Sequence, residues 1–322
     1  MSITPYKIGF LGSDEISIPF LSNLIEDPRF ALTGVLTQPD RPAGRGRKLR
    51  PNPIKEWTTQ HGFPLRDPIK PGVEEVDWFR SLGVDIFLVM AYGHILKHDM
   101  LTVAPVGCFN LHASLLPAYR GASPIETALA YGETETGVTL MRVVPQMDAG
   151  PIVDAEKVKI DSSTTGPTLR VSLAESCIPL VQRNLVKLCE GNHNETIQDA
   201  SLVSYCRKLK KTDGLLDFAK PAHDLSCRIR AFQGWPGSFF EHRGNRIKVG
   251  TAHACTNSGL KSGEVGKTVD GRLFLGTGTT ALEINELQKP GGKMMSSSDF
   301  LRGYASEEGE PLDFVSSESL LL

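Results

Sequence analysis

The sequence predicts an α/β protein in which a doubly wound, mostly parallel sheet is followed by a small β-barrel. Three observations support this prediction. Strand-like and helix-like segments alternate through the first half of the chain, a polar stretch without periodicity follows at residues 190–201, and short strands separated by glycine turns come after it. The chain is 322 residues long, about twice the usual length of one domain, so two domains are expected.

The first half of the chain alternates regularly. Strands are expected at residues 7–12, 31–37, 84–90 and 106–111, and helices at 18–26, 54–61, 74–82 and 123–131. The segment 84–90 (VDIFLVM) is a continuous apolar run, which is typical of a parallel strand covered on both faces. In a sheet of this kind, ligands bind beyond the carboxyl ends of the strands.

A hairpin and a long helix are expected to complete the first domain. Residues 138–144 and 152–160 predict two strands around the turn 146–150 (QMDAG). Residues 168–189 predict a helix because their leucines recur on one apolar face. We therefore expect a first domain at residues 1–189, a linker at 190–206 and a second domain at 207–322.

The second domain is predicted from short elements. A helix is expected at 221–232 and strands at 246–252, 263–269, 272–276 and 281–287. Short strands at this spacing favour a small β-barrel. The tail from residue 306 is expected to be loosely ordered.

Composition narrows the functional classes. The net charge of -2 excludes a uniformly basic nucleic-acid binder, and no segment approaches the roughly 20 apolar residues of a membrane span. The N-terminal residues lack the features of a signal or transit peptide, so a cytoplasmic protein is expected. The six cysteines show no close pairing, which indicates buried thiols, with no disulfide framework and no metal site.

Two polar side chains lie near the end of the strand expected at 106–111. Asn110 and His112 are two residues apart, so their side chains project from the same face, about 7 Å apart along the backbone. Asp148 lies in the turn 146–150, where a carboxylate beside glycine is presented rather than buried. A histidine that caps a turn and an ordinary turn aspartate are the alternative interpretations.

These three residue types suit acyl transfer to an amine. The amine is itself the nucleophile, so the enzyme needs no serine or cysteine nucleophile. Asn110 or protonated His112 would stabilise the developing oxyanion, and His112 with Asp148 would move the proton. The chain has no G-x-S-x-G elbow, no phosphate-binding G-x-x-x-x-G-K-[ST] loop and no G-x-G-x-x-G fingerprint.

Positive charge is concentrated in two places. Residues 40–50 (DRPAGRGRKLR) carry five basic side chains against Asp40, and a flexible basic loop of this kind can grip phosphates. Residues 203–248 carry ten Lys and Arg against four Asp and Glu. A solvated surface loop or a protease-sensitive lid is the alternative for 40–50, and most aromatic residues near the second stretch are expected in the core.

Four segments closely resemble the methionyl-tRNA formyltransferase family over nearly the whole chain. They are NLHASLLPAYRGASPI at 110–125, VTLMRVVPQMDAGPI at 138–152, TQPDRPAGRGRKL at 37–49 and LQKPGGKMMSSSDFLRG at 287–303. The first two resemble segments shared by all folate-dependent formyltransferases. The other two point to the branch that acts on tRNA.

The resemblance implies a function and a set of site residues. The reaction would transfer a formyl group from 10-formyltetrahydrofolate to the methionine amino group of initiator methionyl-tRNA, in a monomeric enzyme without a metal. The catalytic residues would be Asn110, His112 and Asp148. The folate-binding residues would be Ser114, Leu115, Leu116 and Pro117, together with Val89, Met90, Ala91, Tyr92 and Gly93. The tRNA-binding residues would be Arg41, Arg45, Arg47 and Lys48, and Lys208, Lys210 and Lys211 at the start of an oligonucleotide/oligosaccharide-binding (OB-like) barrel.

Some positions differ from the family pattern. Residues 12–17 (GSDEIS) stand where G-T-P-x-F-A is common, Glu126 replaces a usual Gln and Pro151 a usual Asp. Two other functions remain open from the sequence. One is a formyltransferase for an amino sugar nucleotide or another small amine, which the two basic stretches disfavour. The other is an RNA-binding protein with a decayed catalytic domain, which the intact catalytic trio disfavours.

Overall fold

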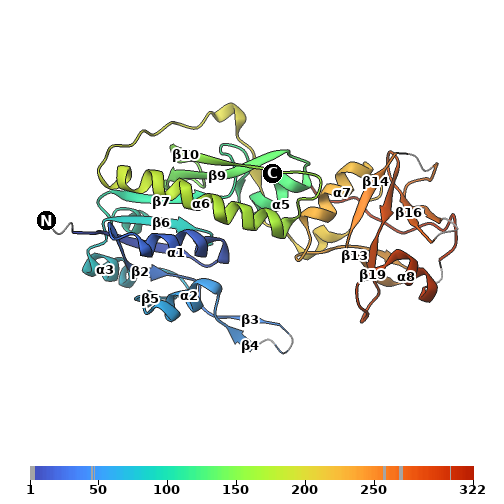
Figure 1. Cartoon of the computed structure of the whole chain (residues 1–322), viewed down its shortest axis with the longest axis horizontal. Coiled ribbons are helices and arrows are strands. Elements are labelled where there is room, and N and C mark those ends of the chain that lie inside the picture. Colours follow the sequence, from blue (N-terminus) through green and yellow to red (C-terminus); the bar gives the residue numbers. More distant parts are fainter. Residues whose placement is uncertain (1–3, 45, 47, 257–258, 268–270, 305) are drawn as a thin grey trace. The chain divides into compact units, whose positions relative to one another are not determined.

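The computed structural model describes residues 4–322 except 45, 47, 257–258, 268–270 and 305 (Figure 1). The chain divides into two compact units, each built from several stretches of sequence. The first unit contains Met1–Arg120, Glu135–Lys159 and Arg170–Ser204, and the second contains Gly121–Thr134, Ile160–Leu169 and Tyr205–Leu322. The domain limits expected at 1–189, 190–206 and 207–322 stay predictions.

One seven-stranded sheet organises the first unit, in the order β10-β9-β7-β6-β1-β2-β5. Its strands are β1 (Tyr6–Gly12), β2 (Phe30–Leu36), β5 (Leu65–Arg66), β6 (Ile86–Met90), β7 (Gly107–His112), β9 (Glu135–Arg142) and β10 (Ile152–Lys159). The neighbouring strands β5, β2, β1, β6 and β7 pair in parallel. Strand β9 pairs antiparallel with both β7 and β10. The prediction of a doubly wound, mostly parallel sheet is therefore confirmed, and the expected 138–160 hairpin is β9 and β10.

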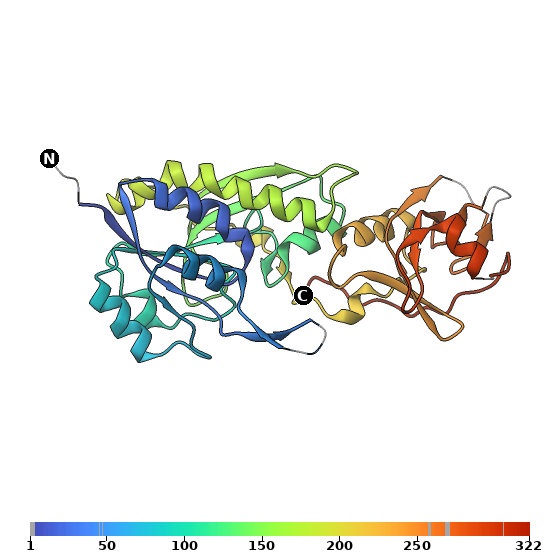
Figure 2. The same cartoon turned by 60° about the horizontal axis from the view of Figure 1, so that its bottom comes forward.

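Helices cover both faces of this sheet (Figures 1 and 2). They are α1 (Ile18–Glu26), α2 (Pro53–His61), α3 (Val73–Leu82), α4 (His98–Leu101) and α6 (Gly166–Cys189). Phe10 of β1 meets Phe20 of α1 edge to face on one side, and Phe87 of β6 meets Phe79 of α3 on the other. All five residues of β6 are buried, as its apolar sequence predicts.

Local capping residues determine where α2 begins and ends. The Asn52 side chain accepts a hydrogen bond from the Lys55 amide, and Pro53 takes the first helical position, where its missing N–H costs nothing. Gly62 ends the helix with a positive φ of 71°, a conformation that favours glycine. These signals are local, so the sequence predicts this helix to within one residue.

The second unit is built around two four-stranded antiparallel sheets, ordered β12-β13-β18-β19 and β14-β17-β16-β15. The strands are β12 (Ser238–His242), β13 (Asn245–Val249), β14 (Ala252–Cys255), β15 (Val265–Lys267), β16 (Leu273–Gly276), β17 (Ala281–Ile284), β18 (Glu286–Gln288) and β19 (Met295–Ser296). Its helices are α5 (Pro124–Ala130), α7 (Ala222–Ala231) and α8 (Ser297–Gly303). Leu216, Phe218, Ile247 and Leu282 share one buried core, in agreement with the predicted small barrel. The strand expected at 281–287 is divided between β17 and β18, and β12 and β14 were not predicted as separate strands.

The expectation that the tail from residue 306 is loosely ordered is wrong. The Val265 amide donates a hydrogen bond to the Glu310 carbonyl over 3.0 Å, and the Arg207 amide donates to the Leu320 carbonyl over 3.0 Å. Leu312 and Leu320 are buried. Apolar side chains in this otherwise polar segment find partners in the second unit, and burying them offsets the cost of ordering the tail.

The basic segment 40–50, expected as a loop, forms a two-stranded ribbon of β3 (Arg41–Ala43) and β4 (Lys48–Arg50). Figures 1 and 2 show this ribbon projecting from the first unit. Arg45 and Arg47 lie outside the described residues. The remaining short elements are β8 (Arg120–Gly121), β11 (Tyr205–Cys206) and the 3₁₀ turns Glu15–Ser17, Ala200–Leu202 and Lys211–Gly214.

Two further observations concern the chain as far as it is described. Each helix there is too short or too polar to cross a membrane. All six cysteines are free thiols, and Cys108, Cys177, Cys206 and Cys227 are buried.

Candidate active site

The structure brings the expected catalytic residues of the first unit to one edge of its sheet. Asn110 and His112 lie on β7, where Asn110 is paired with Val89 on one side and Met141 on the other. Asp148 lies in the turn between β9 and β10. Its Oδ2 is 3.7 Å from Nδ1 of His112, which is only 6% exposed. The imidazole and the carboxylate therefore form a pair, beside the amide two residues earlier on the same strand face.

The two nitrogens of the His112 ring have different partners. Nε2 lies 2.9 Å from the carbonyl oxygen of Tyr119. Because a carbonyl oxygen can only accept, Nε2 carries the hydrogen, and Nδ1 is the basic nitrogen of the neutral ring. This Nδ1 faces Asp148, so the carboxylate stabilises the imidazolium once a proton is taken up.

The turn that carries Asp148 is held from a distant part of the chain. The Gln198 side-chain amide donates to the carbonyl oxygens of Asp148, over 2.8 Å, and Gly150, over 2.7 Å. The Oε1 of Gln198 in turn accepts from Arg120 over 2.7 Å. Asp148 itself has a positive φ of 51°, a conformation that aspartate tolerates better than most residues. These contacts hold the carboxylate toward His112.

Gly150 allows the same turn to close against β9. A Cβ atom at this position would lie 1.8 Å from the carbonyl oxygen of Arg142. The Arg142 amide also donates to the Pro151 carbonyl over 3.0 Å. The turn therefore needs glycine at 150 for the close approach of two backbones.

The segment 114–117 forms a turn directly after β7. The Thr139 hydroxyl donates to the Ser114 carbonyl over 2.7 Å and accepts from the Leu116 amide over 3.0 Å. Ser114 is fully buried, and its hydroxyl donates to the Ala118 carbonyl. Leu115 and Pro117 are partly exposed, whereas Leu116 is buried. The accessible surface of this segment thus comes from Leu115, Pro117 and the backbone.

The segment 89–93 contains the last two residues of the neighbouring strand β6 and the start of the loop after it. Val89, Met90 and Tyr92 are buried, and burial, followed by the charge of Glu75, raises the pKa of Tyr92. Ala91 and Gly93 are exposed and both have positive φ. The Tyr92 carbonyl accepts a hydrogen bond from Gln38 over 2.8 Å. Backbone groups at 91 and 93 are therefore open to a ligand while the side chains around them are packed.

The basic residues expected to contact tRNA are exposed where they are described. Arg41 donates to the Gln38 side chain over 2.6 Å, and Gln38 in turn donates to the Tyr92 carbonyl just after β6. Lys48 lies exposed on β4. Arg45 and Arg47 are not among the described residues.

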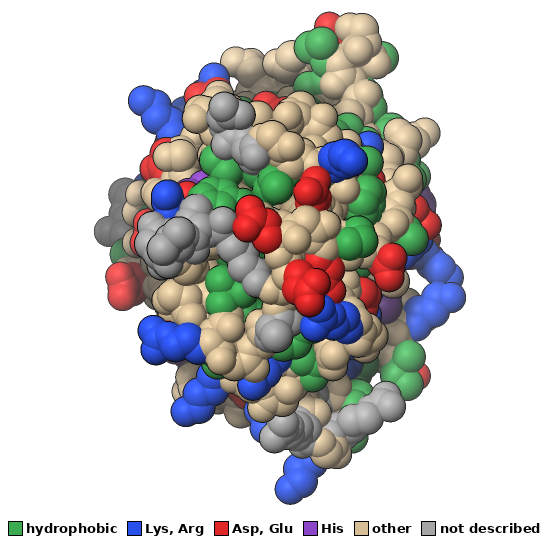
Figure 3. Space-filling view, turned by 90° about the vertical axis from the view of Figure 1, so that its right-hand side faces the viewer, with side chains coloured by type: hydrophobic (Ala, Val, Ile, Leu, Met, Phe, Trp, Pro, Cys, Tyr) green, Lys and Arg blue, Asp and Glu red, His purple; other side chains and the backbone are tan. Residues whose placement is uncertain are grey.

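In the second unit, Lys208, Lys210 and Lys211 are exposed, and Lys210 pairs with Glu318 over 2.8 Å. Arg207 and Arg228 bond instead to Asp213 inside the unit. Figure 3 shows acidic and basic side chains interspersed on one face. Some basic residues of the stretch 203–248 therefore stabilise the second unit through internal hydrogen bonds.

The sequence positions that differ from the family pattern have local roles. In the segment 12–17, the Asp14 side chain accepts from the Ile16 amide and from Arg170 over 3.1 Å. Glu126 lies in the first turn of α5. Within the described part of the chain, no cluster of three or more His, Cys, Asp and Glu residues is arranged to hold a metal ion.

Sequence reasoning missed the residues that hold the site together. Gln198 lies in the stretch expected as a linker, and Thr139 lies in a strand where a buried threonine is common. Neither has a local motif, since each acts on a segment distant in sequence. Only the pattern of a polar residue amid apolar neighbours distinguishes Thr139.

Comparison with known proteins identifies two families that match the chain. The formyl transferase family matches residues 22–178, and the formyl transferase C-terminal domain family matches residues 208–305. A methionyl-tRNA formyltransferase of Parvibaculum lavamentivorans is 37% identical over 309 residues, covering 94% of this chain and 99% of that protein. A methionyl-tRNA formyltransferase of Methylobacillus flagellatus is 40% identical over 299 residues, covering 92% of this chain and 96% of the relative.

Solved structures are similar in fold. The sugar 3N-formyl transferase WlaRD, crystallised in the presence of dTDP and 5-N-formyl-THF, has a TM-score of 0.65 at 18% identity, covering 90% of this chain and 100% of its own. HypX from Aquifex aeolicus in complex with tetrahydrofolic acid has a TM-score of 0.59 at 15% identity, covering 97% of this chain and 51% of its own. These likenesses show the fold alone. The sequence relatives and both matched families show that the chain belongs to the methionyl-tRNA formyltransferase family.

Proposed function

We propose that the protein transfers the formyl group of 10-formyltetrahydrofolate to the free amino group of methionine on initiator methionyl-tRNA. The observation that carries this proposal is the pairing of His112 Nδ1 with Asp148 Oδ2 at 3.7 Å, beside Asn110. In a chain of the methionyl-tRNA formyltransferase family, this pair supplies a proton acceptor and a charge that stabilises it.

The chemistry assigned to the three residues follows from their atoms. The folate supplies a formyl carbon for attack by the methionine amine. His112 Nδ1 accepts the proton that the amine loses and returns it to the departing nitrogen. Asp148 stabilises the imidazolium in between, and the Asn110 amide donates a hydrogen bond to the oxygen that gains negative charge. Catalytic contacts are often longer without substrate, so a 3.7 Å separation suits a pair that tightens when substrate binds.

We assign the folate to the sheet edge of the first unit and the tRNA to basic residues of both units. Exposed backbone at Ala91 and Gly93 and the partly exposed Leu115 and Pro117 support folate binding at the sheet edge. The remaining residues of 89–93 and 114–117 would hold that surface in place. For tRNA, we propose phosphate contacts by the basic residues of the segment 41–50 and by the exposed residues Lys208, Lys210 and Lys211.

One reaction tests the proposal directly. The purified protein is mixed with 10-formyltetrahydrofolate and, separately, with methionine-charged initiator tRNA, methionine-charged elongator tRNA or an amino sugar nucleotide. We expect formylmethionine from the initiator tRNA, little from the elongator tRNA and no formylated sugar. Formylation of the sugar nucleotide alone would replace this proposal with the small-amine alternative.

We also propose that the enzyme acts in the cytoplasm as a monomer. The initiator tRNA assigned as its substrate supports the first point, because the product is used where translation begins. Analytical ultracentrifugation of the purified chain tests the second point. Sedimentation as a single species near 35.1 kDa is expected, and a dimer mass would contradict it.

A further inference from the structure

The segment 196–204 of the first unit contacts the supports of both members of the proposed proton-transfer pair. Near its start it reaches the turn that carries Asp148, and at its end it reaches the backbone that orients His112. None of its residues belongs to the strand and turn that supply the pair itself. Any effect of this segment on the reaction therefore acts through the position of the pair.

The backbone fixes the start of this segment on β10. The Thr196 amide donates to the Ile152 carbonyl and the Ile152 amide donates to the Thr196 carbonyl, each over 2.8 Å. The Gln198 side chain is buried two residues farther along, against the turn 146–150. Because backbone bonds hold the path of the segment, a change of the side chain at 198 alters its contacts with the turn more than the path itself.

The partners of the Gln198 amide determine its orientation. Its Nε2 donates to the carbonyl oxygens of Asp148 and Gly150, which can only accept. Its Oε1 accepts from Nε and Nη2 of Arg120, over 3.0 and 2.7 Å, and a guanidinium can only donate. Both donor hydrogens and the acceptor are used. Asparagine has the same groups on a side chain one methylene shorter, and no other side chain has both.

The end of the segment supports the other member of the pair. The Ser204 hydroxyl accepts from the Tyr119 amide over 2.9 Å, and the Ser204 carbonyl accepts from the Arg120 amide over 2.9 Å. The Tyr119 carbonyl lies between these two amides along the chain and accepts from His112 Nε2. Arg120 therefore links both supports, since its amide follows that carbonyl and its side chain holds Gln198.

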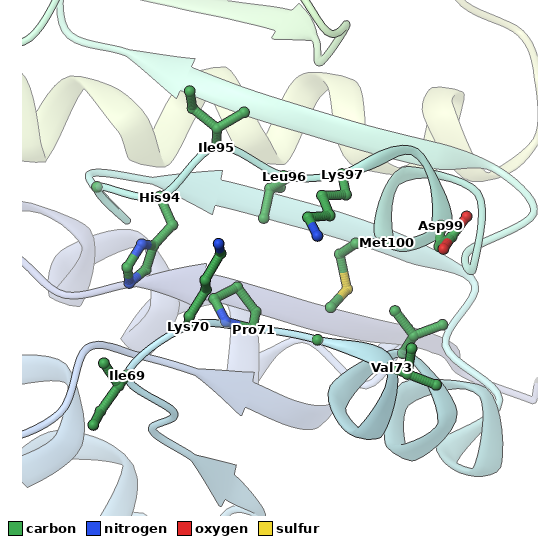
Figure 4. Close-up of a pocket in the computed structure, with 13 residues that line it drawn as sticks. Ile69, Lys70, Pro71, Val73, His94, Ile95, Leu96, Lys97, Asp99 and Met100 are labelled. Carbon is green, nitrogen blue, oxygen red and sulfur yellow. The ribbon is translucent and has the colours of Figure 1, made fainter.

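The pocket shown in Figure 4 is built by other residues. It is lined by the loops 69–73 and 93–97, together with Val76, Asp99 and Met100. None of these lining residues belongs to the segment 196–204, to the turn 146–150 or to β7. A change at residue 198 therefore leaves this lining intact, including Gly93 of the proposed folate segment.

We propose that Gln198 is a positioning residue for formyl transfer, which holds the Asp148 carboxylate toward His112 Nδ1 and is itself oriented by Arg120. The inference rests on the proposed function, since that function assigns proton transfer to this pair. Loss of the two bonds from Nε2 lets the turn relax, so the carboxylate stabilises the imidazolium less well during the reaction. The expected consequence is a lower kcat with unchanged binding of folate and tRNA.

Two substitutions at one position test the inference in steady-state formylation of initiator methionyl-tRNA. Gln198→Glu keeps the shape and the contact with Arg120 but removes both donor hydrogens. Gln198→Leu removes them without adding a charge. We expect each to lower kcat about tenfold and to leave KM for both substrates unchanged. A general loss of folded protein would instead lower kcat whatever residue stands at 148.

The decisive comparison therefore repeats both substitutions in the Asp148→Asn chain. Single-turnover assays with enzyme in excess keep these slow variants measurable. Neither substitution at 198 should lower the rate further, because the turn then has no carboxylate to position. Gln182→Glu is the matched control, since the exposed Gln182 amide of the same unit also donates, to Asn23 over 2.9 Å. It should keep full kcat.

The outcomes separate this inference from the proposed function. Full kcat in Gln198→Leu would overturn the inference and leave the proposed function standing, even if Gln198→Glu were slow, because the added charge would then be the cause. An equal loss with and without Asp148→Asn would also overturn the inference alone. Absence of formylation by the unaltered chain would overturn both.

Discussion

At the scale of single residues, His112 is the group whose surroundings define a chemical role. Its Nε2 is fixed by the Tyr119 carbonyl at 2.9 Å, so only Nδ1 is left to exchange a proton beside Asp148. The ring orientation is set by the backbone, and the carboxylate adds charge without having to fix the tautomer. Loss of the ring should therefore affect proton transfer more than folding.

Replacement of this ring is the first prediction. His112→Ala should lower kcat by about 100-fold or more, because general acid–base catalysis contributes roughly that much. Folate affinity, measured by calorimetry with 5-formyltetrahydrofolate, should change little. His253→Ala, at an exposed histidine of the second unit, serves as the control and should keep full activity. Normal turnover by His112→Ala would remove His112 from the mechanism.

Gly150 tests how closely the turn that carries Asp148 must fit. In Gly150→Ala the new Cβ would meet the Arg142 carbonyl at 1.8 Å, so the turn must move. We expect a loss of about 1–3 kcal/mol in the free energy of unfolding, and reduced kcat because Asp148 moves with the turn. Urea titration and steady-state assays measure the two effects.

Gly303→Ala is the matched substitution, since Lys289 Nζ, at 4.0 Å, is the nearest described atom to a Cβ at that position apart from its chain neighbours and its own helix backbone. It should leave both the stability and the activity nearly unchanged. Equal effects of the two substitutions would show that the close approach at Gly150 does not matter.

At the scale of elements, the ribbon of β3 and β4 is the part of the first unit to which we assign a contact with tRNA. Lys48 and Arg50 are exposed on it, while Arg41 is joined to Gln38 at its base. A basic ribbon attached at one end can contact phosphates without altering the sheet that carries Asn110 and His112.

The salt dependence of tRNA binding tests the ribbon. Arg41→Ala, Arg45→Ala, Arg47→Ala in one chain should weaken tRNA binding and reduce the slope of log K against log salt by about one for each phosphate that the ribbon no longer neutralises. Filter binding at several salt concentrations measures the slope. The control variant Arg80→Ala, Lys159→Ala, Lys187→Ala also removes three basic side chains, which are exposed elsewhere in the first unit. A slope that stays the same in the ribbon variant would show that the ribbon does not touch phosphates.

At the scale of the whole molecule, the C-terminal tail stabilises the second unit through Glu310. Its carboxylate accepts from the Glu307 amide at 2.9 Å, from His242 at 2.9 Å and from Arg243 at 2.7 Å. The Glu307 amide, followed by the His242 and Arg243 side chains, lowers the pKa of Glu310 from 4.5 to about 2. The ionised form is thus favoured by folding.

The sign of the resulting pH dependence is fixed by that shift. A carboxyl whose pKa is lower in the folded state stabilises the fold above its unfolded value of 4.5, and this stabilisation is lost as the pH falls through about 2. Glu310→Gln should therefore lower the free energy of unfolding at pH 6 and lose less stability between pH 5 and pH 3 than the unaltered chain. Thermal unfolding of both chains across this range measures the difference. Parallel curves would contradict the assignment.

The elements that the sequence predicted well are those with local signals. The β6 strand is recognisable because every residue is apolar, and α2 because Asn52, Pro53 and Gly62 mark its ends. The C-terminal tail was predicted wrongly because its few apolar residues are spread through a polar segment. Their burial depends on partners that no local window contains.

For the site, the motif and spacing identified Asn110 and His112, and the turn identified Asp148. The 3.7 Å contact between His112 and Asp148 needed the antiparallel return of β9 beside β7, which places Thr139 opposite His112. The support from Gln198 needed a side chain 50 residues farther along the chain than Asp148. Such contacts follow from the path of the whole chain.

Periodicity and short motifs were enough to predict the fold class, the candidate catalytic residues and the family resemblance, because the signals for each of these lie in short segments of sequence. The folded chain was needed to learn which nitrogen of His112 faces Asp148 and which polar side chains hold the turn. Hydrogen bonds and charge pairs act over a few ångströms, and residues far apart in sequence come within that distance only after the chain has folded.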